Sequence, residues 1–547
     1  MIRLSDLKLP VGTDENALKN AIRKELGLSD QHPFSYVIRH RSLDARRSHA
    51  FTFLYTIDVM VSKEDKIYER GMKRHKKWQR LLSVPSYQMI LPSRKPSSRP
   101  VVVGLGPAGL FAGLLLSRAG LNPILIERGR RVEERKEDTL RFFRDRILDP
   151  ESNVQFGEGG AGTFSDGKVN TLVKDPSHRG RFVLEEMVKA GAPETILYDA
   201  KPHIGTDRLQ KVVQALREEM ITNGAEVLFE TRMTDLVLSE DQTRLCGIIA
   251  EDQSGKRLIQ TDTVFLGIGH SARDTFRMLS DHQIPMEEKA FAVGLRIEHP
   301  RQMIDRSQYR EYAGHPALGA ASYKLTYHSS SGRGVYTFCM CPGGTVVAAA
   351  SEKETIVTNG MSNYARDEEN SNSALLVTVT PDDYQSYSQP DEPHLAGIRF
   401  QQDLEKCAYQ LGGSDYSAPI QRVDDFLSHQ DRVTALGEVQ PSYTGSVRQT
   451  DLHELLPEYL TRPLEEGIVS FGQKIAGFDR PDAILTGVES RSSSPVRILR
   501  GDNFESTMVR GLFPIGEGAG YAGGIMSAAM DGMKACEAYL SNLQESL

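Results

Sequence analysis

One segment near residue 100 constrains the fold more than any other. Residues 100–129 read PVVVGLGPAGLFAGLLLSRAGLNPILIERG, which is an apolar strand, a glycine-rich turn, an apolar helix and a second apolar strand. Two parallel strands joined by a crossover helix are the opening unit of a doubly wound α/β domain. The sequence therefore predicts an α/β fold built on a parallel sheet.

The glycines of this turn have the spacing of dinucleotide-binding turns. Gly104, Gly106 and Gly109 enclose Pro107 and Ala108 in GLGPAG, directly after the strand. The first glycine permits the tight turn, the second lets a pyrophosphate approach the backbone, and the third lets the helix pack on the strand. The positive end of the helix dipole favours the phosphate charge. We predict that this turn binds the phosphates of a dinucleotide.

Glu127, at the end of the second strand, restricts the choice of nucleotide. It lies 23 residues after Gly104 and is followed by Arg128, which we also assign to cofactor binding. At that position a carboxylate can accept both hydroxyls of the adenosine ribose, whereas it would repel a 2′-phosphate. NADP is therefore disfavoured, and NAD and FAD remain.

A glycine-rich loop near the end of the chain separates these two nucleotides. Residues 511–525 read GLFPIGEGAGYAGGI. A Rossmann dehydrogenase completes its NAD site within one contiguous domain, whereas FAD is long enough to need a second contact, so the loop favours FAD. Gly516 and Glu517 can bring a carboxylate to the ribitol chain. A helix that starts at Gly523, Gly524 and Ile525 can point at the flavin N1 and O2 region, which becomes negative on reduction.

Two further glycine-rich segments are predicted to lie near the nucleotide. FGEGGAGTFSDGK, residues 156–168, has amides free to point at a pyrophosphate or at the flavin edge, and its Lys168 could neutralise a phosphate or stabilise reduced flavin. In VFLGIGHS, residues 264–271, Gly267 and Gly269 let the strand end pass close to the nucleotide. An ordinary surface loop is the alternative for residues 156–168. The glycines assigned to cofactor binding in that segment are Gly157, Gly159, Gly160 and Gly162.

These motifs carry a resemblance to a known group of proteins. GLGPAG, the ERG that ends the second strand, VFLGIGHS and GLFPIGEGAG resemble the FAD-dependent oxidoreductases of the glutathione reductase-like superfamily. FGEGGAGTFSDGK, FCMCPGG, GVESRSSSPVR and GLFPIGEGAGYAGGI resemble, more narrowly, a group of functionally uncharacterised bacterial FAD-dependent dehydrogenases with an extra N-terminal domain. The resemblance covers nearly the whole chain and implies non-covalently held FAD and a redox reaction at the isoalloxazine ring. Many relatives have Asp in place of Glu517, and the longer side chain alters the geometry of the expected ribitol contact.

The length and charge of the chain indicate several domains. With 547 residues the chain is too long for one hydrophobic core. We expect a small α+β, ferredoxin-like module over 1–95, a Rossmann-like, doubly wound FAD-binding domain over 96–290 and 441–547, and an inserted, mainly antiparallel β domain over 291–440. Residues 1–100 hold 20 Lys and Arg against 10 Asp and Glu, although the whole chain has a net charge of -7. The N-terminal module is therefore basic and the remainder acidic.

Four polar residues are candidates for the substrate side of the site. Arg491 and Arg497 lie in GVESRSSSPVR, just before the last glycine-rich loop, and could bind a carboxylate or phosphate through bidentate hydrogen bonds. Ordinary ion pairs are the alternative. His203 and His270 are candidate proton donors, although a lone histidine is more often a structural residue.

The five cysteines indicate neither a disulfide framework nor a zinc site, and we expect no bound metal. Cys339 and Cys341 are spaced i, i+2 on one face of a predicted strand, unlike the CxxC and CxxxxC pairs of flavoprotein disulfide reductases. Because no second GxGxxG follows a strand to hold NAD(P)H, we interpret them as buried structural cysteines.

We therefore expect an FAD-dependent oxidoreductase, a dehydrogenase or reductase that transfers hydride through flavin N5 to or from a small, anionic or unsaturated organic substrate. NAD(P)H is a candidate electron donor. One alternative is a non-catalytic FAD-binding redox sensor. Another is a flavin-dependent RNA-modifying enzyme, in which Arg39, Arg41, Arg46, Arg47 and the stretch 73–80 would follow a phosphate backbone.

The start of the chain has no apolar segment of signal-peptide type, and no long stretch is free of charge and clustered glycine. We therefore expect a cytoplasmic protein without a membrane partner. The sequence leaves open the identity of the substrate, the electron acceptor and the oligomeric state.

Overall fold

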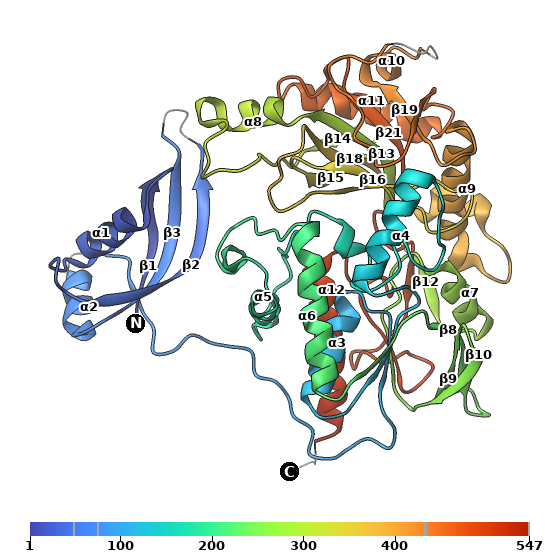
Figure 1. Cartoon of the computed structure of the whole chain (residues 1–547), viewed down its shortest axis with the longest axis horizontal. Helices are drawn as coiled ribbons and strands as arrows, with labels where there is room; N and C mark the ends of the chain where they lie inside the picture. The colour runs from blue at the N-terminus through green and yellow to red at the C-terminus, as the bar shows by residue number, and fades with distance from the viewer. Residues whose placement is uncertain (47–49, 74–75, 431–434, 545–547) are drawn as a thin grey trace.

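The computed structural model describes residues 1–46, 50–73, 76–430 and 435–544. Arg47, Arg74 and His75 of the predicted basic surface lie outside the described residues. The chain forms an N-terminal domain, a domain built on a parallel sheet, and an inserted domain built on a larger mixed sheet (Figure 1).

The N-terminal domain is a four-stranded antiparallel sheet with two helices, in the order β2-β3-β1-β4. Its helix α1 follows from the sequence, since Leu18, Ile22 and Leu26 form one apolar stripe that is buried, and Asp14 caps the first turn by accepting from the Ala17 N–H. The elements are β1 (Ile2–Pro10), α1 (Glu15–Leu26), β2 (Phe34–Asp44), β3 (Thr52–Val61), α2 (Glu64–Lys73) and β4 (Gln79–Arg80).

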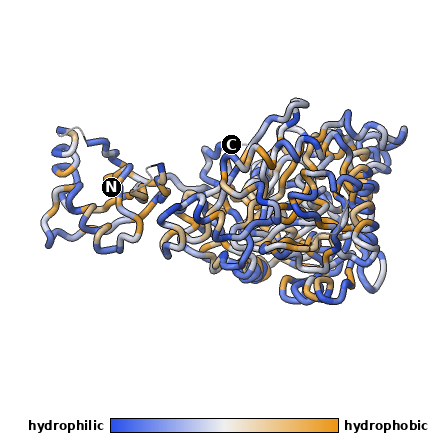
Figure 2. Tube along the Cα trace, turned by 90° about the horizontal axis from the view of Figure 1, so that it is seen from above, coloured by the Kyte–Doolittle hydropathy of each residue, from blue (hydrophilic) through white to orange (hydrophobic). Residues whose placement is uncertain are grey.

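This domain is a separate lobe at one end of the molecule (Figure 2). It contacts the rest of the chain through the end of β2, where Arg41 forms a bidentate ion pair with Asp199 at 2.7 and 2.9 Å. It also contacts the inserted domain, because the buried Phe51 ring stacks on Tyr312 at 4.6 Å. In addition to the linker, the contacts of the lobe thus include this ion pair, this aromatic stack and two backbone hydrogen bonds of Arg41, from its N–H to the Tyr198 carbonyl and from the Ala200 N–H to its carbonyl.

The second domain is built on a five-stranded parallel sheet of order β23-β11-β5-β6-β7. Strands β5, β11 and β23 are short apolar runs buried on both faces, as expected for a parallel sheet. The elements that build or cover this sheet before the insertion are β5 (Val101–Val103), α3 (Pro107–Arg118), β6 (Ile124–Ile126), α4 (Val132–Asp145), η1 (Ala161–Phe164), α5 (Arg179–Lys189), η2 (Glu194–Leu197), α6 (Thr206–Thr222), β7 (Glu226–Leu228), β8 (Arg232–Leu238), β9 (Leu245–Asp252), β10 (Gly255–Gln260), β11 (Val264–Leu266), α7 (Arg273–Asp281) and β12 (Met286–Glu288). The elements after the insertion are β22 (Val496–Ile498), β23 (Leu512–Pro514) and α12 (Ile525–Asn542).

Alternate residues of each strand point to opposite layers. Val102 packs with α3, α6 and α12 in one apolar core. Val101 and Val103 pack in another core with the antiparallel sheet β10-β9-β8 and with α7. The parallel sheet is therefore covered on both faces, which places its strand ends, rather than its faces, within reach of a ligand. In Figure 1, α3, α6 and α12 lie side by side along this sheet.

The inserted domain is built on a seven-stranded sheet of order β14-β15-β18-β13-β21-β19-β20. All neighbouring pairs are antiparallel except β19 and β20. Its elements are β13 (Phe291–Pro300), α8 (Arg301–Tyr309), η3 (Arg310–Tyr312), β14 (Thr326–His328), β15 (Gly334–Cys341), β16 (Thr345–Ala348), β17 (Thr358–Met361), β18 (Asn370–Val379), η4 (Pro381–Tyr387), η5 (Pro393–Leu395), α9 (Ala396–Leu411), β19 (Ala418–Arg422), α10 (Val423–Leu427), β20 (Val447–Gln449), α11 (Glu458–Gly472) and β21 (Ile484–Glu489).

The expected end of the insertion at residue 440 is wrong. Strands β20 and β21 and helix α11 belong to the inserted domain, because β21 pairs antiparallel with β13 and β19. The chain returns to the parallel-sheet domain only at β22, which pairs with β12. A helix followed by an apolar strand resembles one unit of a parallel sheet, and only the pairing partner distinguishes the two cases.

Two smaller points complete the fold. Helix α6 begins at Thr206 with Gly205 as its N-cap, and the Thr206 hydroxyl donates to the Thr163 carbonyl at 2.6 Å. Among the described residues, no helix has the length and apolar character needed to cross a membrane.

Candidate functional site

The GLGPAG turn follows β5 and has a different constraint at each glycine. Gly104 has φ +89, and a Cβ there would lie 2.4 Å from the Gly267 carbonyl oxygen. A Cβ on Gly109 would lie 1.9 Å from the Gly104 carbonyl oxygen. A Cβ on Gly106 would meet nothing closer than the Gly160 Cα, at 3.9 Å. The first and third glycines are therefore required by protein packing, and the second leaves backbone open to a ligand.

The glycine-rich segments predicted to share one ligand come together in space. A Cβ on Gly162 would lie 3.1 Å from the Ile525 side chain, and one on Gly516 would lie 2.8 Å from the Ala108 Cβ. A Cβ on Gly518 would lie 2.5 Å from the Gly269 carbonyl oxygen. The segments 104–109, 157–162, 267–269 and 516–525 therefore converge where β5, β11 and β23 end.

Two long helices begin at this point. Helix α3 has Gly106 as N-cap and Pro107 at its first position, and α12 has Gly524 as N-cap. Neither N-cap residue supplies a side-chain cap hydrogen bond, and a Cβ on Gly523 or Gly524 would meet no described atom within 4 Å. Free first-turn N–H groups and the positive ends of two helix dipoles make this an anion-binding geometry.

Glu127 lies at the end of β6, as predicted, and is 5% exposed. Its carboxylate accepts three backbone N–H groups: Leu105 at 2.8 Å, Gly129 at 3.0 Å and Gly157 at 3.0 Å. The side chain therefore joins the GLGPAG turn to the segment that begins at residue 156. A ribose would have to share these oxygens with the backbone.

Glu517 lies at the other end of the convergence and has a different environment. It is half-buried, and no described residue hydrogen-bonds to its carboxylate. Burial raises the pKa of the Glu517 carboxyl to about 7, and the nearby Lys289 ammonium opposes this shift. This carboxyl is therefore an available acceptor for hydroxyl groups.

Arg135 is a site residue that the sequence reasoning missed. This fully buried guanidinium donates to the carbonyls of Asn153 and Val154 and to those of Gly157, Glu158 and Gly160. Burial lowers its pKa to about 10. It holds the 153–160 segment in place from within α4. A signal existed in the sequence, because Arg135 falls on the stripe of α4 that also carries Val132, Thr139 and Phe142.

Arg491 does not offer a free guanidinium, contrary to the prediction that it binds substrate. Its Nε and Nη2 donate to Glu405 at 2.9 and 2.7 Å, and its Nη1 donates to Ser271 and Ser351. Glu405 is fully buried and also pairs with Arg273 at 2.8 Å. Arg491 is thus part of a buried ion-pair network that joins the inserted domain to the parallel-sheet domain.

Arg497 is likewise occupied, contrary to the prediction. It lies on β22, where it faces Glu287 of β12, and its Nη1 contacts that carboxylate at 2.8 Å. Both side chains are partly exposed. This is the ordinary ion pair that the sequence left as an alternative.

The two candidate histidines are not suited to donate a proton near neutral pH. Burial, followed by the charges of Arg491 and Arg273, lowers the pKa of His270 to about 3. Burial and the charge of Arg366 lower the pKa of His203, whose Nε2 lies 3.1 Å from the Tyr364 carbonyl oxygen. The lowered pKa of each histidine disfavours its protonated form and therefore disfavours the predicted role of proton donor.

The predicted cations Lys168 and Arg128 are also paired. Lys168 lies 2.7 Å from Asp166 and donates to the Met340 carbonyl. Arg128 donates to Glu151 at 2.8 Å and to Asp274 at 3.0 Å. Either side chain could bind a phosphate only after breaking one of these ion pairs.

The two cysteines of FCMCPGG do not share one face, contrary to expectation. Strand β15 has a register shift between Phe338 and Cys341, and Cys339 has φ +42. Cys339 is exposed and Cys341 is buried, and both are free thiols. Burial raises the pKa of the Cys341 thiol. The expectation of buried cysteines therefore holds for Cys341 alone.

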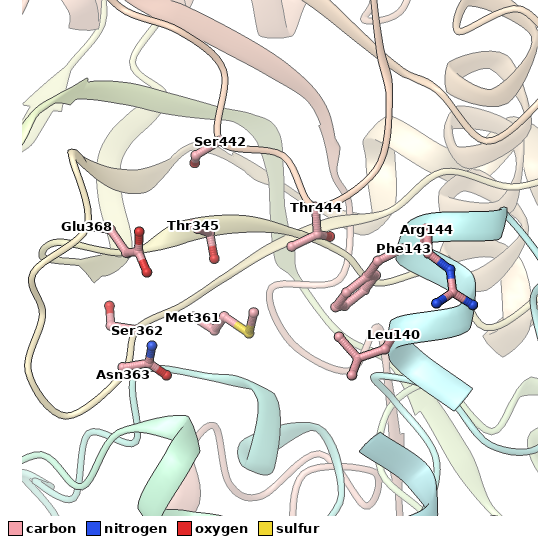
Figure 3. A pocket seen from close by; sticks show the side chains of 11 residues that line it. Leu140, Phe143, Arg144, Thr345, Met361, Ser362, Asn363, Glu368, Ser442 and Thr444 are labelled. Atoms are coloured by element: carbon pink, nitrogen blue, oxygen red, sulfur yellow. The ribbon is translucent and has the colours of Figure 1, made fainter. Parts of the chain in front are cut away.

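A cavity of about 460 Å³ lies between α4 and the inserted domain (Figure 3). Leu140, Phe143 and Arg144 of α4 face β16, β17 and the loop at 442–444 across it. None of the predicted site residues lines it. A second cavity of about 310 Å³ is lined by Arg128, Ser271 and Arg273. We place the candidate cofactor site at the converging turns because free backbone donors and an available carboxylate occur there.

The fold is that of a three-domain α/β protein in which two helix N-termini meet glycine-rich turns near the ends of parallel strands. Comparison with known proteins agrees with the class that the sequence suggested. Residues 290–492 match the family model described as "FAD-dependent protein, C-terminal domain-like", and residues 1–60 match a domain of unknown function, DUF8436.

Among full-length relatives, an uncharacterized protein of Clostridium beijerinckii is 46% identical over 538 residues, which is 98% of each chain. The chain therefore belongs to the same family as this protein. A probable fumarate reductase, Ifc3, of Shewanella frigidimarina is 22% identical over 192 residues, which is 32% of each chain. The solved structure of a flavocytochrome c3 fumarate reductase aligns with 88% of this chain over 82% of the reductase chain. The sequence identity is 13% and the TM-score is 0.34.

Proposed function

We propose that this protein is an FAD-dependent oxidoreductase that transfers hydride to or from a small, anionic organic substrate. The observation that carries the proposal is the convergence of glycine-rich turns at the N-termini of α3 and α12, which follow β5 and β23, two parallel strands that flank β11 in the sheet. The match of residues 290–492 to an FAD-dependent family supports it.

The residues present fit a flavin dinucleotide at both of its ends. The pyrophosphate would be held by the open backbone at Gly106 and by the first turn of α3, with the 157–162 segment covering it. Glu127 would be shared with the adenosine ribose. Glu517 would accept ribitol hydroxyls, and the first turn of α12 would lie at the flavin N1 and O2 edge. When bound, FAD supplies hydride transfer at N5.

An anionic substrate is favoured by the charges between the 166–168 segment and the inserted domain. Lys168 and Arg366 both contact Asp166, at 2.7 and 2.8 Å. Lys201 lies close enough to Arg366 for its pKa to be lowered by that charge, after the larger effect of burial. Two cations, Lys168 and Arg366, contact the one carboxylate of Asp166, and Lys201 lies near Arg366. This net positive charge would attract and orient an anion. Lys289, half-buried beside Glu517, adds a further ammonium near the loop that precedes α12.

Anaerobic reduction distinguishes an oxidoreductase from a redox sensor. We expect the flavin absorbance of the purified protein to bleach on addition of NADH, NADPH or a reduced organic donor, and to return when an electron acceptor is supplied. Bound flavin that no donor reduces at a rate above that of free FAD would favour the non-catalytic sensor.

Nucleic-acid binding by the N-terminal domain stays a prediction, and the described contacts disfavour it. Arg3 and Arg39 both pair with Asp58, and Arg41 pairs with Asp199 of the parallel-sheet domain. Charges neutralised in this way release few counterions from a phosphate backbone. Filter binding to tRNA across a salt series tests the point: affinity at low salt with a steep salt dependence would support the RNA-modifying alternative.

A further inference from the structure

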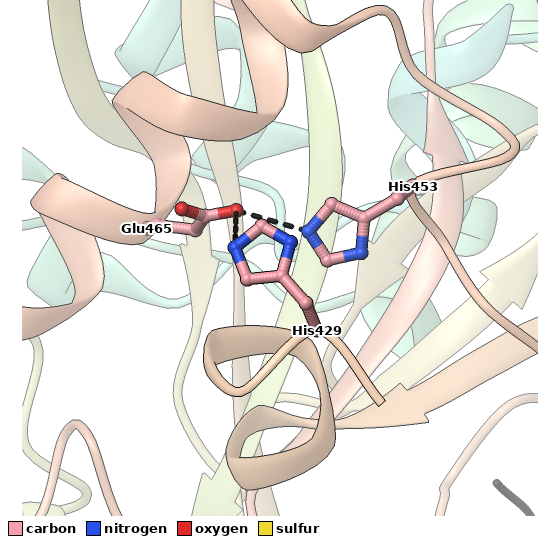
Figure 4. Close-up of side chains that lie close together, drawn as sticks. All are labelled: His429, His453 and Glu465. Carbon is pink, nitrogen blue, oxygen red and sulfur yellow. Dashed lines mark hydrogen bonds and ion pairs between the residues drawn. The ribbon is translucent and has the colours of Figure 1, made fainter. Parts of the chain in front are cut away.

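A cluster of two histidines and a glutamate lies on the inserted domain, formed by three separate segments. His429 follows α10, His453 lies between β20 and α11, and Glu465 is on α11. Figure 4 shows the two imidazole rings and the carboxylate meeting at one point. None of the residues predicted for the cofactor or substrate belongs to this cluster, so it requires a separate explanation.

The distances fit the ligand set of a small divalent cation. The Glu465 Oε1 atom lies 2.9 Å from His453 Nε2 and 3.4 Å from His429 Nε2. The three ligand atoms all lie within 4.8 Å of one another. Metal–ligand bonds of about 2.0–2.1 Å in a tetrahedron separate neighbouring ligand atoms by roughly 3.4 Å. The two distances from Glu465 Oε1 lie within about 0.5 Å of this separation.

The surroundings of His453 are those of a metal-bound imidazole. Its Nδ1 lies 2.8 Å from Asp451 Oδ1, which also accepts the His453 backbone N–H at 2.9 Å. Asp451 thus fixes the ring so that Nδ1 donates and Nε2 faces Glu465. A carboxylate on the far nitrogen is the usual outer partner of a histidine ligand. Phe426 stacks on the same ring at 4.4 Å and limits its rotation.

The side where the three ligand atoms meet is accessible from solvent, because His429 is exposed. Its side chain is 62% exposed, whereas His453 and Glu465 are mostly buried at 17% and 18%. The His429 ring stacks on His453 at 4.5 Å, with an interplanar angle of 25°. Three protein ligands on one side and solvent on the other leave room for a water as the fourth ligand.

The geometry points to a zinc site formed by His429, His453 and Glu465, with water as the fourth ligand. Two imidazoles and a carboxylate in a tetrahedral arrangement suit Zn²⁺, and the absence of sulfur from the set disfavours softer ions such as Cu(I). Zinc would bind the unprotonated Nε2 of His453, while Nδ1–H continues to donate to Asp451. The metal would tie α11 to the end of α10 and brace this side of the inserted domain.

Metal analysis of the full-length protein tests the site. After treatment with a chelator and equilibrium dialysis against zinc chloride, we expect about one Zn²⁺ per chain by mass spectrometry, and a zinc X-ray absorption spectrum with N and O ligands at roughly 2.0–2.1 Å. His453→Gln or Glu465→Gln should weaken zinc binding by roughly 100-fold or more, and Asp451→Asn by roughly 10–100-fold.

His282→Gln is the matched control, because His282 also contacts a carboxylate, Asp235, but lies outside the cluster. It should leave zinc binding unchanged. Absence of stoichiometric zinc uptake would overturn the proposal. So would sulfur ligands in the absorption spectrum, or uptake that the cluster variants leave unaltered, because both results would place the metal elsewhere.

Discussion

The two ends of the candidate cofactor site use similar residues in opposite ways. At the dinucleotide end, Glu127 is buried and accepts three backbone N–H groups, and a Cβ on Gly109 would collide with backbone at 1.9 Å. At the flavin end, no described residue hydrogen-bonds to the Glu517 carboxylate, and a Cβ on Gly523 would meet no described atom within 4 Å.

This difference indicates that residues at the dinucleotide end mainly stabilise the fold, whereas residues at the flavin end mainly bind the ligand. The dinucleotide end is packed against the protein itself, so its glycines and its carboxylate contribute to stability before any ligand arrives. The flavin end leaves its donors and acceptor available, so its residues should matter mainly for the ligand. Substitutions at matched positions of the two ends can test this separation.

The largest contrast is expected between Gly109→Ala and Gly523→Ala. Gly109→Ala forces a methyl group into the Gly104 carbonyl and should lower the free energy of unfolding by about 3 kcal/mol or more. Gly523→Ala should change it by less than about 0.5 kcal/mol, because the position is open. Denaturant unfolding of the flavin-free proteins measures both. Equal destabilisation would contradict the proposed division.

Substitution of Glu127 should likewise cost more unfolding free energy than substitution of Glu517. Glu127→Ala leaves three buried N–H groups without their acceptor and should cost about 2–4 kcal/mol of unfolding free energy. Glu517→Ala should cost less than about 1 kcal/mol, since no described hydrogen bond is lost. Chemical denaturation of flavin-free protein gives both values. A Glu517→Ala loss as large as that of Glu127→Ala would show that the flavin end is also structural.

Gly106→Ala should separate binding from stability within the dinucleotide end. A Cβ there lies 3.9 Å from the nearest described atom, so the fold should tolerate it. The methyl group would, however, stand where the pyrophosphate approaches, and we expect FAD affinity to fall by about 10–100-fold, or about 1.4–2.8 kcal/mol. Fluorescence titration with FAD measures this effect. Gly180→Ala, on α5 with its nearest contact at 3.4 Å, is the control and should bind FAD normally.

The pH dependence of Glu517 tests the flavin end without removing any contact. Its pKa is raised in the folded protein to about 7, so the folded state holds a proton that the unfolded state has released at the same pH. The stability of flavin-free protein should therefore fall as pH rises from about 4.5 to about 7, and this component should vanish in Glu517→Gln. Melting temperatures of both proteins across this range provide the measurement. A parallel pH dependence in the two proteins would contradict the raised pKa.

The sequence predicted the glycine turns because their chemistry is local. Gly104 and Gly109 are required by a backbone geometry that a strand, a turn and a helix impose within a few residues. The convergence with residues 516–525 followed from the length of FAD rather than from any pattern of pairing. Arg135 could have been found in the same local way, as a charged residue on the apolar stripe of α4.

The arginines could not be assigned from sequence, because their partners are distant. Arg491 pairs with Glu405, 86 residues away, and Arg497 with Glu287, 210 residues away. Whether an arginine is free for a ligand depends on such long-range contacts, which leave no local signal. The end of the insertion was misplaced for the same reason, since the pairing of β21 with β13 joins residues far apart in the chain.

One ligand is proposed to reach both ends of the site. Titration of flavin-free protein with FAD, FMN and riboflavin tests this proposal most directly. We predict that FAD binds at about one per chain and far more tightly than FMN, because only FAD reaches the GLGPAG turn and Glu127 as well as Glu517 and α12. Failure to bind FAD, or equal affinity for FAD and FMN, would contradict it.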